Sequence, residues 1–296
     1  MSTTNAAGAA RRHRYRHRAA VWSIRLLVVA VLFGAWLYET GPGKVSPLLL
    51  PHLSDVAQSF YQTIKTGSVW SDAWVTVAEF LLAFCLAAGA GVVVGFLCSR
   101  THLRSQIADP LLNFGYMVPL AMFFPIFTLW FGVGIASKVF YAGVGGFFPV
   151  AVNAIRGFRS VDGRLLRMGR AFGASRVQSE LQIKWGAALP LVLTGIRLGA
   201  ATSLIGVVLG EMLAAERGLG YELTRSSQSF QTADTYALVV LLLVIVVVIQ
   251  MLIGRLDTQR GRKRRRGWVM TSATSRRAAA ADSNLEEAVP SDQVAV

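Results

Sequence analysis

The chain has 296 residues, of which 53% are hydrophobic and 16% are charged, and its mean hydropathy is +0.48. An average soluble domain has about 25% charged residues, so the composition excludes an ordinary water-soluble domain and indicates a membrane protein. The formal net charge of +14 does not indicate a nucleic-acid-binding protein, because the Lys and Arg residues gather in segments between apolar runs. Basic segments between apolar runs are typical of cytoplasmic loops.

Six apolar segments are long enough to cross a bilayer, which takes about 20 residues in a helix. The segment from Pro110 to Ile155 is too long for one crossing, and an aromatic and glycine-rich break at 130–134 divides it into two. We therefore expect an all-α integral membrane protein with about six spans. The expected spans are residues 20–38, 80–99, 111–130, 139–155, 187–210 and 236–254.

The distribution of Lys and Arg predicts the orientation of these spans. The two chain ends, the link before 111–130 and the segment 156–186 together hold 23 of the 30 basic residues. These four segments alternate with poorer ones, so both termini are expected in the cytoplasm. We expect disordered tails at 1–18 and 269–296 around one transmembrane domain at 19–268. The Arg-rich start also resembles a signal peptide, but no small-residue cleavage site precedes Glu39, which favours an uncleaved first helix.

The residue types that carry enzyme chemistry do not form a recognisable set in this sequence. The four histidines lack metal-ligand spacing, and the two cysteines lie 13 residues apart in one apolar segment, too far for a disulfide. There is no Ser-His-Asp set, no Gly-rich phosphate loop and no carboxylate pair within an apolar segment. We expect no catalytic residue, no metal site and no cofactor on this chain, and hence no enzyme activity of its own.

The long segment 156–186 is the most informative part of the sequence. Leu165, Leu166, Met168 and Phe172 recur at helical spacing, which predicts a short amphipathic helix. Gly173 then supplies a turn, and a second helical stretch leads into the next span. A long inner loop of this kind can present a helix to a partner protein.

The same segment carries a family resemblance. Gly173 is followed by Ala174 and Ser175, and the stretch from Ala187 to Gly199 reads AALPLVLTGIRLG. With VPLAMFFPIFTLWFGVGIASKVF at 118–140 and GGFFPVAVNAIRGF at 145–158, the chain resembles the permeases of binding-protein-dependent ABC importers. The resemblance is to the sulfonate, taurine, nitrate and bicarbonate branch, and it covers residues 46–268. It departs at 167–169, where Arg-Met-Gly replaces the usual Glu-Ala-Ala, and at 185–186, where Trp-Gly replaces Leu-Pro.

The resemblance implies a type I importer (MetI-like) permease fold with a cytoplasmic coupling helix. Two permease copies, as a homodimer, would form the pathway in the bacterial inner membrane, with ATP and Mg²⁺ held by separate ABC ATPase subunits. An extracytoplasmic solute-binding protein would deliver the substrate, which we expect to be a small anion such as a sulfonate, taurine or nitrate. The residues implied for the ATPase-coupling loop are Arg164, Leu165, Met168, Gly169, Arg170, Ala171, Phe172, Gly173, Ala174 and Ser175.

Five residues are candidates for lining or gating the pathway: Pro119, Met122, Pro125, Arg197 and Glu211. The prolines would kink a span, although membrane helices also tolerate proline without function. An intramembrane Arg197 is a functional candidate, yet it lies near enough to one end of its span to snorkel. Glu211 either faces the outer mouth of the pathway or ends a solvated helix.

Close helix packing is predicted at Gly91 and Gly95, which have the small-xxx-small spacing of membrane helices. This spacing indicates packing and not a binding site.

Two other function classes compete with the importer. A transporter driven by an ion gradient often has internal repeats and acidic residues at mid-membrane, and neither is evident in this sequence. A membrane anchor for a cytoplasmic complex would explain the basic inner loop but not the resemblance between Val118 and Phe158.

Overall fold

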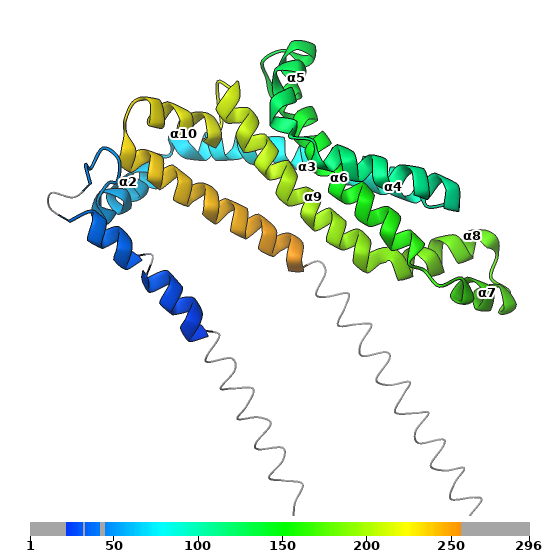
Figure 1. Ribbon diagram of the computed structural model, residues 1–296. Coiled ribbons are helices and arrows are strands. Elements are labelled where there is room, and N and C mark those ends of the chain that lie inside the picture. Colours follow the sequence, from blue (N-terminus) through cyan, green and yellow to red (C-terminus); the bar gives the residue numbers. More distant parts are fainter. Residues whose placement is uncertain (1–21, 32, 42–44, 256–296) are drawn as a thin grey trace, which may run out of the picture. The chain divides into compact units, whose positions relative to one another are not determined.

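The computed structural model describes residues 22–31, 33–41 and 45–255, and within these ranges every regular element is a helix (Figure 1). Five helices are long and apolar enough to cross a membrane, and a bent pair of helices brings the number to six if it is counted as one span. The all-α membrane fold expected from the sequence is therefore confirmed. The tails expected at 1–18 and 269–296 lie outside the described residues.

The first and last of these spans are Trp22–Glu39 and Thr232–Arg255. The helices between them, in chain order, are α2 (Leu53–Thr66), α3 (Ser68–Cys98), α4 (His102–Met117), η1 (Leu120–Phe123), α5 (Phe124–Phe131), α6 (Ile135–Arg159), α7 (Gly163–Ala171), α8 (Arg176–Gln178), η2 (Ser179–Lys184), α9 (Trp185–Leu213) and α10 (Leu219–Gln228).

The chain divides into two compact units. Unit 1 takes the described residues up to Thr76 together with Glu211–Leu243, and unit 2 takes Val77–Gly210 together with the described residues from Val244 onward. In unit 1, the indole N–H of Trp36 donates to the carbonyl of Pro51 at 3.1 Å, and its ring lies edge-on to Tyr236 with 5.3 Å between centroids. The hydroxyl of Ser59 on α2 also donates to the carboxylate of Asp234. These contacts tie α2 and the first span to the start of the last span.

Helix α3 begins twelve residues before the expected span at 80–99. It starts at Ser68 and includes two carboxylates, Asp72 and Glu79. The expected boundary followed Glu79 because a charge inside an apolar run is costly unless it has a partner. Both carboxylates have partners in the structure, so the helix continues through them.

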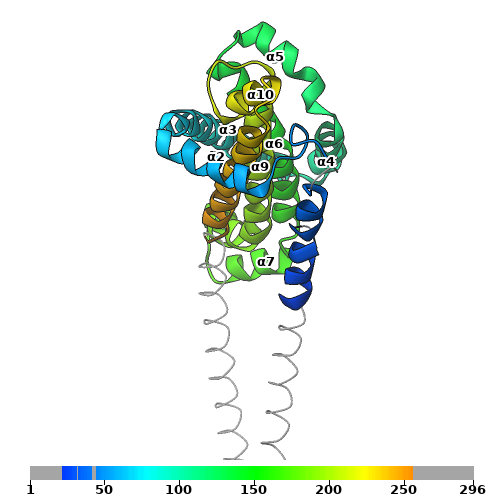
Figure 2. The same cartoon turned by 90° about the vertical axis from the view of Figure 1, so that its left-hand side faces the viewer.

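The segment expected as one helix at 111–130 is broken. Helix α4 ends at Met117, and Leu120–Phe131 continues at an angle of 78° to it. Val118 has an extended backbone (φ −65°, ψ 128°) because the ring of Pro119 disfavours a helical conformation in the preceding residue. Pro125 lies in the first turn of α5, where its missing N–H costs nothing. Both views show α5 and α7 at opposite ends of unit 2 (Figures 1 and 2).

Small residues allow α3, α6 and α9 to approach closely in unit 2. A Cβ placed on Gly91 would lie 2.7 Å from Cβ of Val150, and one on Gly95 would clash with Ala154. The packing role predicted for Gly91 and Gly95 is confirmed. Large apolar side chains such as Leu82 and Val93 are exposed on the opposite side of α3, as expected of a helix that faces lipid.

Candidate functional site

The segment after α6 folds into a hairpin of two short helices, α7 and α8. The Asp162 carboxylate caps α7 by accepting the N–H of Arg164 at 2.8 Å. At the other end, Gly173 N–H donates to the carbonyl of Arg170 and Ala174 N–H donates to that of Gly169, both at 3.0 Å. This pair of bonds is a Schellman motif, which needs a left-handed residue at its turn. Gly173 has φ +86° and satisfies that requirement without strain.

A capping box then starts α8. The Ser175 hydroxyl accepts the N–H of Gln178 at 3.2 Å, and the Gln178 side chain accepts the N–H of Ser175 at 2.9 Å. The π-helical turn η2 follows directly and leads into α9. The hairpin is therefore capped at every free helix end and presents α7 in a fixed geometry.

Helical spacing arranges the side chains of α7 in three rows. The packed row is Leu166 and Gly169; both are half-buried, and a Cβ on Gly169 would clash with Ile183 of η2. The apolar row is Leu165, Met168 and Phe172, with exposed fractions of 46%, 56% and 87%. The basic row is Arg164, Arg167 and Arg170, all exposed. Residues three or four apart share one face of a helix, so the apolar and basic rows lie side by side along the outside of α7.

The structure brings the predicted coupling-loop residues together in this hairpin. All ten lie between the start of α7 and the N-cap of α8. Ala171 closes α7, Phe172 is its C-cap and Gly173 is the turn. Their role in contacting an ATPase stays a prediction.

The five pathway candidates are divided between the two units. Pro119, Met122 and Pro125 lie on the bent segment of unit 2, and Met122 is 76% exposed. Arg197 lies on α9, with its Nη2 atom 3.9 Å from the place of a Cβ on Gly254 in the last span. Glu211 belongs to unit 1. Their roles in lining or gating a pathway stay predictions.

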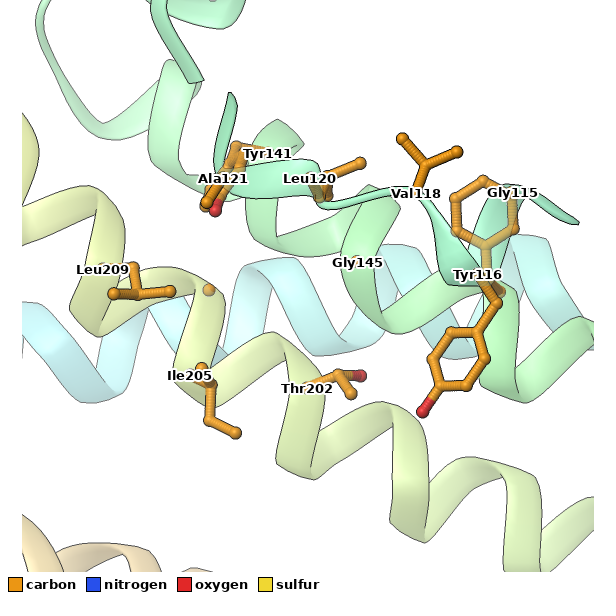
Figure 3. A pocket seen from close by; sticks show the side chains of 12 residues that line it. Gly115, Tyr116, Val118, Leu120, Ala121, Tyr141, Gly145, Thr202, Ile205 and Leu209 are labelled. Atoms are coloured by element: carbon orange, nitrogen blue, oxygen red, sulfur yellow. The ribbon is translucent and has the colours of Figure 1, made fainter. Parts of the chain in front are cut away.

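A cavity of about 230 Å³ lies beside the break in unit 2, and sequence reasoning did not find it (Figure 3). Its walls come from α4, η1, α6 and α9. The lining residues are Gly115, Tyr116, Val118, Leu120, Ala121, Tyr141, Gly145, Phe148, Thr202, Ile205, Gly206 and Leu209. Hydroxyl groups are the only polar side-chain groups in this set, and none of the twelve side chains is charged.

A buried ion pair joins α3 and α6 in unit 2, and the hydropathy of the sequence does not predict it. The ammonium group of Lys138 contacts the Glu79 carboxylate, with side-chain exposed fractions of 4% and 2%. Glu79 directly precedes the expected span 80–99, and Lys138 directly precedes the expected span 139–155. The signal was present, because Lys138 is the one charge between Pro110 and Ile155.

In unit 1, side chains from α3 and α9 cap the N-terminus of α10. The amide N–H of Gly218 donates to Asp72 at 3.2 Å, that of Leu219 to the Thr76 hydroxyl at 3.0 Å, and that of Gly220 to Glu211 at 2.8 Å. The Thr76 hydroxyl donates to the other Glu211 oxygen at 2.7 Å. The first amides of a helix have no partner within it, so this α10 clamp supplies what the helix lacks.

The Glu211 carboxylate is enclosed by this arrangement. Only 1% of the residue is exposed, and a Cβ on Gly218 would run into the carboxylate. The contacts give Glu211 a structural part in holding α10, which neither interpretation of the sequence had foreseen.

Comparisons with known proteins agree on one family. Residues 75–266 match the family described as "Binding-protein-dependent transport system inner membrane component". The putative aliphatic sulfonates transport permease protein SsuC of Bacillus subtilis is 31% identical over 220 residues, which are 74% of this chain and 80% of that protein. The taurine transport system permease protein TauC of Escherichia coli is 30% identical over 211 residues, 70% of this chain and 76% of that protein.

Among solved structures, a chain of the MetNI methionine ABC transporter in an inward-facing conformation has a TM-score of 0.51 and 16% identity, covering 72% of this chain and 98% of that chain. At this identity the likeness concerns the fold, and it confirms the expected MetI-like architecture.

Proposed function

Because the chain belongs to the family of binding-protein-dependent transport system inner membrane components, we propose that its α7–α8 hairpin is the element through which a separate ATPase drives it. As a member of this family, the chain is the multi-pass permease subunit of an ATP-binding-cassette importer, and it works with ATPase and binding-protein partners. The hairpin is the coupling element of this permease. Closure of the ATPase pair on ATP moves the hairpin and biases the span bundle between two conformations.

One observation carries this proposal. The apolar row of α7 is exposed on a helix that is capped at both ends. Phe172 exposes 87% of its surface, and an apolar group on a rigid element suits a protein–protein contact, because little conformational entropy is lost when it docks.

The proposal includes an orientation in the membrane. The hairpin lies in the cytoplasm, with both chain termini on the same side, in the plasma membrane of a bacterium. Support comes from the seven Lys and Arg residues between 156 and 186, because cytoplasmic loops are enriched in basic residues. Two copies of the chain form the pathway as a homodimer.

The substrate is a small anion of the aliphatic sulfonate, taurine or nitrate kind. Support comes from the relatives whose names refer to aliphatic sulfonates and taurine. The cavity beside the break offers hydroxyl groups and no charged lining side chain. Such a lining supplies no counter-charge that would retain an anion, so we assign selection of the substrate mainly to the binding protein.

Co-purification tests the coupling role. The tagged chain is extracted from its native membrane in detergent, and the proteins that come with it are identified. We expect an ABC ATPase in equal amount with the wild-type chain and its loss with Phe172→Asp, since a carboxylate would replace the most exposed member of the apolar row. The matched control is Phe230→Asp, an aromatic residue 72% exposed in unit 1, which should keep the ATPase. Equal recovery of the ATPase with both variants would contradict the proposal.

A further inference from the structure

The basic row of α7 indicates the charge of the partner surface, which the apolar row does not. From Gly163 to Gln178 the chain has four arginines and no acidic residue. The flanking acids are already engaged: Asp162 caps α7, and Glu180 pairs with Lys184 at 3.1 Å. Within the part of the chain that the structure describes, no carboxylate pairs with Arg164, Arg167 or Arg170.

When α7 docks, the apolar row and the basic row contact different parts of the same groove. They lie next to each other on one short helix, so a groove that receives the apolar row also meets the basic row along its side. A guanidinium that loses water without gaining a counter-charge reduces affinity, and a basic neighbour reduces it further. The capped hairpin keeps the backbone of α7 fixed, so the three arginines start from positions next to the apolar row.

From these facts we infer that the ATPase groove for α7 has two unlike walls: an apolar wall against the apolar row and an acidic wall against the basic row. The inference rests on the proposed function, since it describes the partner surface for the same hairpin. Arg167 is central in the basic row and is the residue on which the acidic wall acts most. The basic row thereby selects the ATPase that fits this permease, because an ATPase with a neutral or basic groove would leave three guanidinium groups uncompensated.

The experiment measures binding of the ATPase that co-purifies with the chain. The full chain is placed in nanodiscs of zwitterionic lipid, and the dissociation constant is measured across about 50 to 500 mM salt. We expect affinity to fall as salt rises. Arg167→Glu should weaken binding by about tenfold or more at low salt, which corresponds to about 1.4 kcal/mol. Arg167→Lys keeps the charge and should stay within about threefold of the wild type.

The matched control is a charge reversal at an arginine outside the hairpin. Arg217→Glu reverses an exposed arginine in unit 1 and should leave the affinity unchanged. If Arg167→Glu binds like the wild type while Phe172→Asp does not bind, the hairpin docks but the groove is not acidic, and only this inference fails. If neither change affects binding, the proposed coupling role fails as well. If the Arg167→Glu effect appears only when anionic lipid is added to the nanodiscs, the basic row contacts lipid headgroups, and the inference is overturned.

Discussion

At the scale of single residues, the ion pair between Glu79 and Lys138 is the most consequential feature that hydropathy did not reveal. Both side chains are almost fully buried inside candidate spans. Removing one partner of such a pair leaves an uncompensated charge in an apolar medium, whereas replacing both partners with apolar residues is often nearly neutral. The pair is therefore best tested by single and double replacement.

We expect Lys138→Met to destabilise the protein by about 3–5 kcal/mol and the double variant Glu79→Met, Lys138→Met to recover most of that loss. The measurement is the thermal unfolding midpoint of purified protein in detergent, followed by the loss of the folded peak in gel filtration. If the two single changes and the double change shift the midpoint additively, the ion pair does not contribute to stability as described.

Glu211 permits a second prediction at the same scale. Its carboxylate accepts the Gly220 amide and the Thr76 hydroxyl in a buried position. Glu211→Ala leaves both donors without this acceptor, and we expect it to cost about 2–4 kcal/mol of stability. Glu211→Gln keeps the shape and one oxygen, so its effect should be smaller.

The control for Glu211 is Glu216→Ala, because Glu216 is an exposed carboxylate in the link before α10. It should leave the free energy of unfolding unchanged within about 0.5 kcal/mol, so the thermal midpoint should stay that of the wild type. A Glu211→Ala protein as stable as the Glu216→Ala protein would mean that the α10 clamp holds α10 by contacts other than this carboxylate.

At the scale of elements, the α7–α8 hairpin depends on the left-handed turn at Gly173. A β-branched residue in that conformation costs about 1–2 kcal/mol, whereas asparagine tolerates it. A Cβ at this position has open space around it, so the penalty is a backbone effect and not a clash. We expect Gly173→Val to reduce substrate uptake strongly and Gly173→Asn to retain most of it.

The measurement for Gly173 is uptake of the proposed substrate, supplied as a radiolabelled aliphatic sulfonate to cells that depend on this permease. The amount of each variant in the membrane is checked by immunoblot, since both should insert normally. Equal uptake by the valine and asparagine variants would show that the left-handed turn has no part in coupling.

The same elements show how far sequence reasoning reaches. Long apolar helices follow from hydropathy, and α7 with its turn followed from the spacing of Leu165, Met168 and Phe172. Helices α2 and α10 were not predicted, because hydropathy detects only apolar helices that are long enough to span. The cavity, the ion pair and the α10 clamp were missed for one reason: each joins residues far apart in the sequence, as Asp72 and Gly218 are, and no local pattern reports that pairing.

At the scale of the whole molecule, the fold is that of an importer permease, while its orientation in the membrane remains a prediction open to a direct test. Cys85 and Cys98 are free, so both are first replaced by alanine. Single cysteines are then placed at Arg176 in the hairpin and at Arg217 in the link before α10, both exposed positions. With a thiol reagent that does not cross membranes, we expect labelling of intact cells at 217 and not at 176.

Permeabilised cells are the control for this labelling, because both positions should then react. Labelling at 176 in intact cells would invert the proposed topology and place the hairpin out of reach of a cytoplasmic ATPase.

The ion pair between α3 and α6 also has a consequence for how the protein is made. Glu79 leaves the ribosome 59 residues before Lys138, so α3 can reach the bilayer before its counter-charge has emerged. Until α6 follows, the nascent chain holds a carboxylate that is costly in lipid. During that time α3 lacks the partner that it has in the folded protein. The Glu79 carboxylate gains its counter-charge when Lys138 reaches it. The buried pair between α3 and α6 is therefore completed only in the later of the two helices to be made.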